Sequence, residues 1–203
     1  MPLTNMSVSQ PCPEPILASV LILLPPSEKK STHPGAAIDV YTGVLYKALG
    51  WQSLNKSSQS RGQRSIAIIS AKYGVLKPLD EIEPYKQKIN IAAMRTQVTQ
   101  TLSARKATLI IDCRSSTYKG VWTPPSQDCV EIKVFINLDG QKKVITHMSK
   151  KTRGEVTRLL LQSKSIPTNP QELHTVISAA YHCELITPTE ISPWVLEVGS
   201  LRA

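Results

Sequence analysis

The sequence has few aromatic residues and no long apolar run. Aromatic side chains make up 5% of its 203 residues, with a single phenylalanine, which is little for a protein that stacks single-stranded nucleic acid on rings. The apolar stretch ILASVLILL at residues 16–24 is too short to span a bilayer. No basic segment typical of a signal peptide precedes it. We therefore predict no membrane contact and interpret the stretch as a buried strand.

Cysteines are also few, and the common catalytic motifs are missing. The four cysteines are Cys12, Cys113, Cys129 and Cys183. None has the CxxC or Cys/His spacing of a zinc site, so we predict no metal. Scattered free thiols are typical of the reducing cytosol, and we predict a cytoplasmic location. The Walker, Rossmann, GxSxG and HExxH patterns are absent. We predict no cofactor, leave the catalytic residues unassigned and leave open whether the protein is an enzyme.

Positive charge is what the sequence has in excess. Lysine and arginine together number 24 against 15 acidic residues, which gives a net charge of +9. Such a charge favours an anionic partner, which could be nucleic acid, a phosphorylated or sulfated small molecule, or an acidic protein. The alternative is that the charge serves solubility alone.

Short apolar strands alternate with helical patterns along the chain. Predicted strands cover residues 18–24, 65–69 and 108–112, and predicted helices cover residues 38–49, 91–106, 150–163 and 170–182. Residues 53–64 are predicted to be an irregular polar connection. Residues 130–138 alternate, Asp139-Gly140 is a turn signal, and Lys143 to Met148 would be the partner strand of a β-hairpin.

This pattern predicts an α/β fold with a mixed, mostly parallel central sheet, flanking helices and a β-hairpin. The proline-rich residues 1–15 are expected to form a flexible tail. Residues 16–203 are expected to form a single domain.

Three of the predicted strands run directly into polar loops. The loops are PPSEKK, SAKYGVLKPLDEIEPY and DCRSSTY. Because the carboxyl ends of parallel strands meet at one edge of a sheet, we expect these loops to form one cleft that includes Lys30. The basic start of the helix after the hairpin would add further cations. The predicted ligand-binding residues are Ser27, Lys29, Ser70, Lys72, Tyr73, Asp80, Tyr85, Arg114, Ser116, Tyr118, Lys150, Lys151 and Arg153.

Roles within this set follow from side-chain chemistry. The cations expected to hold an anionic group are Lys72, Arg114 and Lys151. The hydroxyls expected to donate hydrogen bonds are Ser27, Ser70 and Ser116. Asp80 is expected to orient Tyr73 or Tyr85. Alternatives stay open: Arg114 could form a structural pair with Asp112, the basic helix could be a solvated face, and the central loop could bond only its own backbone.

Five blocks of the sequence together resemble the YaaA family of bacterial peroxide stress proteins. The blocks are LLPPSEKK, VYTGVLYKALGW, SAKYGVLKPLDEIEPY, IDCRSSTY and THMSKKTRGEVTRLL, in family order over roughly residues 17–161. The resemblance implies an α/β fold with a positively charged cleft, a cytosolic location and a role in limiting oxidative damage. It also implies a link to DNA, which some members are thought to bind. Family members usually carry a helical segment of several dozen residues where only Ser31 to Asp39 stands here.

Two functions are compatible with these observations. In the first, the chain is a YaaA-like cytosolic protein of the oxidative (peroxide) stress response that binds an anionic ligand, nucleic acid included, in a basic cleft. In the second, it is a YaaA-like biosynthetic enzyme or enzyme subunit that acts on an anionic or nucleotide-like small molecule, with a partner chain replacing the missing helices.

The shortened segment also leads to a prediction about assembly. Without the missing helices, apolar residues of the VYTG block would lie bare. These residues are Val44, Leu45, Tyr46 and Leu49. Soluble monomers rarely leave such a patch open, so we expect a homodimer or a small partner chain over this surface.

Overall fold

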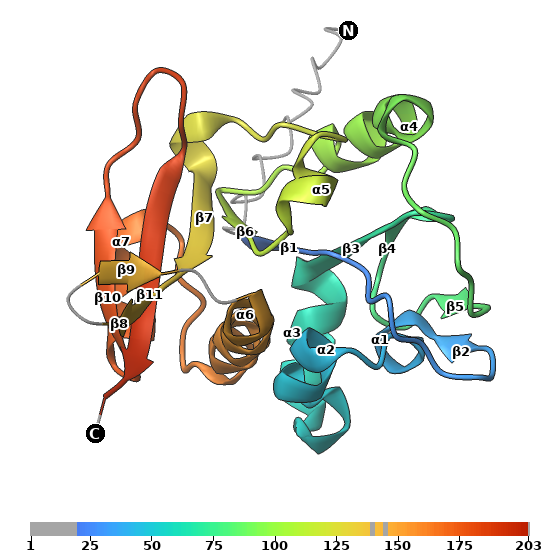
Figure 1. Ribbon diagram of the computed structural model, residues 1–203, viewed down its shortest axis with the longest axis horizontal. Coiled ribbons are helices and arrows are strands. Elements are labelled where there is room, and N and C mark those ends of the chain that lie inside the picture. Colours follow the sequence, from blue (N-terminus) through green and yellow to red (C-terminus); the bar gives the residue numbers. More distant parts are fainter. Residues whose placement is uncertain (1–19, 139–140, 144–145, 203) are drawn as a thin grey trace, which may run out of the picture.

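A seven-stranded sheet forms the centre of the molecule, which we describe from a computed structural model (Figure 1). The structure describes residues 20–138, 141–143 and 146–202, with only the backbone described for residues 136–138, 141–143 and 146. The expected tail at residues 1–15 lies outside this part. The strand order is β10-β11-β7-β6-β1-β3-β4. The strands are β1 (Val20–Leu24), β3 (Ile66–Ser70), β4 (Gly74–Leu76), β6 (Leu109–Asp112), β7 (Cys129–Val134), β10 (Tyr181–Ile186) and β11 (Trp194–Leu201).

The five inner strands are parallel, which confirms the predicted mixed, mostly parallel sheet. β1 pairs in parallel with β3 and β6, and β7 pairs in parallel with β6 and β11. Only the edge strands β4 and β10 are antiparallel to their neighbours. All five residues of β1 are buried, as expected for a strand with helices on both faces.

Helices cover both faces of the sheet, with α2, α3 and α6 on one side and α4 and α5 on the other (Figure 1). The helices are α1 (Ala37–Val40), α2 (Val44–Leu49), α3 (Lys56–Ser65), α4 (Ile91–Ser103), α5 (Ser116–Lys119), α6 (Thr146–Gln162) and α7 (Pro170–Ser178). Within the described residues, no helix combines the length and the apolar character needed to cross a membrane.

Two small antiparallel pairs complete the fold. β2 (Gly35–Ala36) pairs with β5 (Glu81–Ile82), and β8 (Ile136–Leu138) pairs with β9 (Gln141–Lys143) as the predicted hairpin. The turn expected at residues 139–140 lies outside the described residues. The bounds predicted for the partner strand, Lys143 to Met148, were wrong, because β9 covers Gln141–Lys143 and α6 begins at Thr146.

The predicted helix 38–49 is wrong as a single element. Tyr41 is extended, with φ −79° and ψ 106°, and separates α1 from α2. The cause is β-type pairing with the preceding loop, because Ser31 N–H donates to the Val40 carbonyl at 2.8 Å and Thr42 N–H to the Lys29 carbonyl at 3.0 Å. Two strand-like hydrogen bonds therefore replace the helical ones at this point.

The irregular connection predicted for residues 53–64 is also wrong, because α3 occupies most of it. The helix begins at Asn55, whose side chain accepts a hydrogen bond from Ser58 N–H at 2.8 Å. Its buried face consists of Ser58, Gly62 and Ser65. A side chain at Gly62 would collide with the Trp51 ring. The helix thus packs through small residues and shows no apolar stripe in the sequence.

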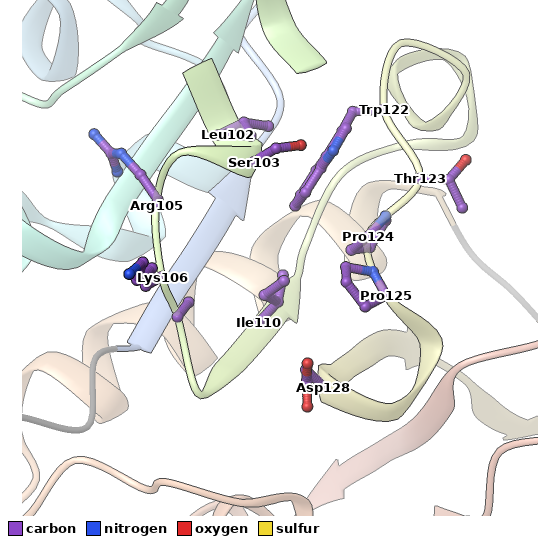
Figure 2. Close-up of a pocket in the computed structure, with 11 residues that line it drawn as sticks. Leu102, Ser103, Arg105, Lys106, Ile110, Trp122, Thr123, Pro124, Pro125 and Asp128 are labelled. Carbon is purple, nitrogen blue, oxygen red and sulfur yellow. The ribbon is translucent and has the colours of Figure 1, made fainter. Parts of the chain in front are cut away.

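On the α4 side, a core cluster forms around Leu21, Leu23, Leu102 and Trp122. A cavity of about 380 Å³ opens beside it, between the end of α4 and the connection from α5 to β7 (Figure 2). It lies at the amino ends of β6 and β7, because its lining residues come just before these strands.

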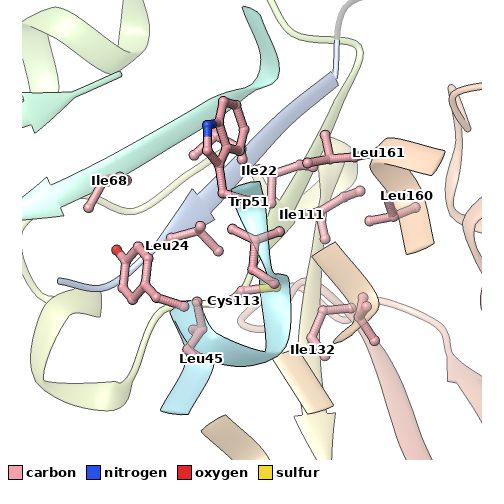
Figure 3. Packing of buried hydrophobic residues seen from close by; sticks show 14 of the residues in the cluster. Ile22, Leu24, Leu45, Trp51, Ile68, Ile111, Cys113, Ile132, Leu160 and Leu161 are labelled. Atoms are coloured by element: carbon pink, nitrogen blue, oxygen red, sulfur yellow. The ribbon is translucent and has the colours of Figure 1, made fainter. Parts of the chain in front are cut away.

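The larger core cluster lies on the opposite face, under α2, α6 and α7 (Figure 3). Leu45, Tyr46 and Leu49 of α2 are buried in it. α6 approaches α2 closely, because a side chain at Gly154 would collide with the Leu45 carbonyl oxygen. The apolar surface on which we expected a homodimer or partner chain is therefore already covered within the chain.

Candidate functional site

Three polar loops leave the sheet at the same edge. β1 lies between β3 and β6 and is parallel to both, so the residues that follow these strands emerge side by side. They are the loop 25–30 after β1, the loop 70–73 after β3 and the segment 112–118 after β6. We call this edge of the sheet, together with the residues that pack on it, the carboxyl edge.

Lys30 lies over two tyrosine rings at the carboxyl edge. Its Nζ is 4.1 Å from the centre of the Tyr85 ring and 5.7 Å from that of Tyr41, within the range of a cation–π contact. The same ammonium donates a hydrogen bond to the Ser27 carbonyl at 2.7 Å. Burial lowers the pKa of Lys30, and the nearby Glu28 carboxylate offsets this in part.

A chain of three hydroxyls runs beneath Lys30. The Tyr41 and Tyr85 hydroxyl oxygens are 2.8 Å apart, and the Tyr85 hydroxyl is 2.8 Å from Ser70 Oγ. Ser70 Oγ also accepts from the backbone N–H groups of Lys72 and Tyr73. Tyr41 and Ser70 are buried, and burial raises the pKa of Tyr41 well above its ordinary value. Tyr41 therefore keeps its hydroxyl proton at neutral pH.

Two further tyrosines extend this aromatic group. The Tyr73 ring meets the Tyr85 ring edge-on, with centroids 5.8 Å apart, and Lys72 Nζ lies 4.8 Å from the Tyr73 centroid. Lys72 also forms an exposed ion pair with Glu83 at 3.6 Å. Burial, then the nearby Tyr85 and Glu28, raise the pKa of Tyr118 to about 12. The structure thus places Tyr73, Tyr85 and Tyr118, three of the predicted ligand-binding residues, near one another.

Arg114 is turned into the protein. Its side chain is 1% exposed, and its Nε and Nη2 donate to the two carboxylate oxygens of Asp112 at 2.9 and 2.8 Å. Its Nη1 donates to the carbonyls of Tyr118 and Trp122. Arg114 thereby fixes the loop that carries α5. These contacts correspond to the structural alternative for Arg114, and not to a grip on a ligand.

Asp80 does not orient a tyrosine. Its Oδ2 accepts from Lys77 N–H at 2.8 Å, which closes its own turn. Ser27 lies in the carboxyl edge, where it packs so closely on Gly43 that a side chain at that glycine would collide with its hydroxyl. Lys29 is exposed beside it, and Ser116 is exposed at the start of α5.

The cations of α6 divide into exposed and bound ones. α6 runs parallel to α2, since Gly154 packs on Leu45 and Arg158 donates to the carbonyls of Leu49 and Gly50 at 3.0 Å. The basic first turns of α6 therefore lie toward the start of α2, near the carboxyl edge. Lys150 is exposed there.

The two other predicted cations of α6 have protein partners. Lys151 pairs with Glu155 at 3.4 Å. The guanidinium of Arg153 donates to the Ile132 carbonyl at 3.3 Å. Arg153 is thus engaged by the sheet, whereas Lys151 keeps half of its side chain exposed.

The described cysteines are not reactive groups of this site. Burial raises the pKa of Cys113 to about 12 and that of Cys183 to about 11, and it also raises that of Cys129. Within the described part of the chain, no group of three metal-ligating side chains is found. The cavity of Figure 2 contains none of the predicted site residues and lies at the opposite edge of the sheet.

Sequence reasoning did not select Tyr41, which joins the hydroxyl chain to Lys30. We had interpreted it as part of the helix 38–49. The available signal was a tyrosine in the apolar pattern of a buried segment, since a buried tyrosine hydroxyl usually needs a hydrogen-bonding partner. Lys30 was expected in the cleft but was not among the selected residues.

The architecture places the chain among α/β proteins in which polar loops follow the carboxyl ends of a mostly parallel sheet. Its sequence matches the family described as peroxide stress protein YaaA over residues 26–185, and the chain belongs to this family.

Curated relatives of the chain are described as UPF0246 proteins. One from Streptomyces coelicolor is 29% identical over 173 residues, which cover 79% of this chain and 66% of the relative. One from Shewanella woodyi is 30% identical, with 73% and 64% covered. One from Corynebacterium efficiens is 32% identical, with 69% and 60% covered. The chain thus spans 60 to 66% of the length of these relatives.

Proposed function

We propose that this chain acts in the response to peroxide stress by binding a small anionic ligand at the carboxyl edge. The family description supports the first half of this proposal. The position of Lys30 supports the second. Its ammonium is partly buried between tyrosine rings and lies within ion-pair distance of no carboxylate among the described residues. Partial burial disfavours the charged ammonium, which the nearby Glu28 offsets only in part, and a ligand anion would favour the charged form further.

The single ammonium of Lys30 suggests a small anionic group for the proposed ligand. Lys30 has two N–H groups beyond the one donated to Ser27, and its ammonium lies over the rings of Tyr85 and Tyr41. Such a site suits a single carboxylate, phosphate or sulfate group on a compact molecule. An extended polyanion would need a row of exposed cations instead.

The direct test is the thermal stability of the purified chain in inorganic phosphate or sulfate. Both anions are expected to raise the melting temperature of the wild type at constant ionic strength, adjusted with chloride. Lys30→Met should show no such rise. Lys29→Met is its matched control and should respond like the wild type, since Lys29 neighbours Lys30 but is exposed. Equal melting temperatures with and without the oxyanions, at concentrations up to tens of millimolar, would reject anion binding at this edge.

Nucleic acid is the second candidate, and the net charge of +9 favours it. Lys29 and Lys150 are exposed toward the same edge and could contact phosphates of a duplex. Duplex binding should weaken steeply as salt rises, and Lys150→Ala should lower the slope of log affinity against log salt by about one contact. A filter-binding titration that detects no duplex binding at low salt would remove this candidate.

The stress role is tested in cells. Expression of the chain in a bacterium that lacks its own protein of this family should improve survival of a hydrogen peroxide challenge. Lys30→Met, expressed at the same level, should not. Equal survival with the wild type and an empty vector would contradict the role in peroxide stress.

A further inference from the structure

Gly43 marks a very close approach between the start of α2 and the loop that follows β1. A side chain added at Gly43 would collide with the Ser27 hydroxyl, and its first carbon would lie 3.2 Å from the Ser27 Cβ atom. That distance is shorter than the optimal contact of two carbon atoms. Rotation of the Ser27 side chain would move the hydroxyl away, but the Cβ atom is fixed to the backbone. Any side chain at Gly43 therefore requires the loop itself to move.

The backbone conformation of Gly43 does not explain why a glycine stands there. Its φ of −73° and ψ of 176° are extended values that any residue adopts. Gly43 is also the residue just before α2, where serine, asparagine or aspartate would stabilise the start of the helix better than glycine does. The absence of a side chain is thus accounted for by the space that Ser27 occupies.

The loop that Gly43 admits is the one that carries Lys30. The carbonyl of Ser27 accepts the hydrogen bond of the Lys30 ammonium at 2.7 Å. Two backbone hydrogen bonds, at 2.8 and 3.0 Å, join residues 29–31 of the loop to residues 40–42, which lead into Gly43. A shift of Ser27 away from α2 would therefore move the carbonyl that holds the ammonium, while residues 29–31 stay tied to the segment before α2.

We infer that Gly43 is a positioning residue of the anion site and acts on Lys30 through Ser27. Because Gly43 has no side chain, Ser27 packs against the start of α2. The Ser27 carbonyl then holds the Lys30 ammonium over its two tyrosine rings. The inference rests on the proposed function, since it concerns the placement of the cation that the proposed ligand would meet.

The test compares Gly43→Ala with Gly35→Ala by isothermal titration with inorganic phosphate and with sulfate. Gly35 is a matched control, because it lies in the same connection between β1 and α2 and a side-chain carbon there would meet only Val40, at 4.0 Å. Gly43→Ala should weaken oxyanion affinity about tenfold, the effect of one misplaced hydrogen bond to a charged group. Gly35→Ala should bind like the wild type.

A second background tests whether the effect passes through Ser27. Ser27→Gly removes both atoms that a side chain at Gly43 would meet and keeps the carbonyl that Lys30 contacts. Residues in contact give non-additive effects, so Gly43→Ala should weaken phosphate affinity in the wild type and have no further effect in the Ser27→Gly protein. A loss of equal size in both backgrounds would overturn the inference.

Thermal melting of the same variants separates positioning from folding. A purely structural glycine would lower the melting temperature of Gly43→Ala and leave the affinity of the folded protein unchanged, which would overturn the inference. If Gly43→Ala is unfolded, the double variant with Ser27→Gly should be folded and should bind phosphate like Ser27→Gly alone. An unfolded double variant would show that the collision is not with Ser27 and would also overturn the inference.

The titrations distinguish failure of the inference from failure of the proposed function. If wild type binds neither phosphate nor sulfate, the proposed function fails and this inference fails with it. If wild type binds, Lys30→Met abolishes binding and Gly43→Ala binds like wild type, the proposed function stands and the inference alone is overturned.

Discussion

Arg114 and Lys30 each follow a central strand of the sheet at the same edge, yet their surroundings differ. Arg114 follows β6, is buried, and is bonded to both carboxylate oxygens of Asp112 and to two carbonyls. Lys30 follows β1, is partly buried, and has two aromatic rings and one carbonyl as its contacts. Four of the five N–H groups of Arg114 are bonded within the fold, whereas one of the three N–H groups of Lys30 is.

The difference teaches how to separate structural from ligand-binding cations. Both residues stand in polar loops that the sequence marks equally well, so position along the chain does not distinguish them. What distinguishes them is the balance of donors and acceptors within hydrogen-bonding distance. Removing the Arg114 side chain, whose donors have protein acceptors, should lower the stability of the protein. Removing the Lys30 ammonium, which has donors left over, should weaken ligand binding.

The largest expected effect is that of Arg114→Met. The substitution leaves the Asp112 carboxylate buried and unpaired, which should lower the free energy of unfolding by about 3–5 kcal/mol. Urea denaturation measures this. Lys29→Met is the control for loss of one exposed positive charge at the same edge. A loss no larger than that of the control would show that the Arg114–Asp112 pair does not hold the α5 loop.

The second effect is that of Lys30→Met on oxyanion binding. Methionine keeps an unbranched apolar stem over the rings, so the stability of the ligand-free protein should change little. Wild type should gain about 1.4 kcal/mol of stability at a phosphate concentration ten times its Kd, and the variant should gain nothing. Phosphate-dependent urea denaturation of both proteins checks this, and an equal gain in both would place the anion elsewhere.

A smaller effect concerns pH. Burial lowers the pKa of Lys30 in the folded protein below its ordinary value of 10.5. Between these two values, the unfolded chain binds more protons than the folded one, so the free energy of unfolding should rise with pH. The rise should appear in the difference between wild type and Lys30→Met across the alkaline range below pH 10.5. A difference that is flat over this range would contradict the lowered pKa.

Oxyanion affinity should move in the opposite direction over the same range. Binding needs the charged ammonium, so it should weaken as Lys30 loses its proton. Titrations at several pH values would show this decline beginning below the pH at which an exposed lysine deprotonates.

The smallest effect is expected at the exposed pair Lys72–Glu83. The pair lies at the same edge, but both side chains are exposed, so solvent screens their attraction. Glu83→Gln should leave the urea midpoint unchanged within error. A clear loss of stability would show that an exposed ion pair at this edge also stabilises the fold. Burial and hydrogen bonding would then not distinguish the structural cation from the others, as the comparison of Arg114 with Lys30 assumes.

Much of the fold could be predicted because its signals are local. The fully buried β1 and β3 read as short apolar runs, and their parallel pairing follows from the helices between them. The helix 38–49 was wrong because Tyr41 pairs with Lys30 across a loop, which is a non-local contact. α3 was missed because its buried face holds serines and glycine, which no hydrophobic period reveals.

The location of the candidate site could be predicted from the sequence, but the contacts that its side chains make could be predicted only in part. Tyr73, Tyr85 and Ser70 could be found because they stand directly after a buried strand. The role of Arg114 depends on whether its guanidinium turns inward, and that choice is made by carbonyls as far along the chain as Trp122. Tyr41 was missed because the sequence pattern alone does not show what a buried hydroxyl touches.

The raised pKa values of the three described thiols, two of them buried and one half-buried, have a practical consequence for a protein proposed to act during peroxide stress. Peroxide oxidises the thiolate and hardly touches the thiol. With the pKa of Cys113 raised to about 12 and that of Cys183 to about 11, thiolate is scarce at these positions near neutral pH. These positions would then stay reduced while more acidic cysteines elsewhere in the cell are consumed. At these three positions the side chains would therefore be expected to pass through peroxide exposure without becoming oxidised.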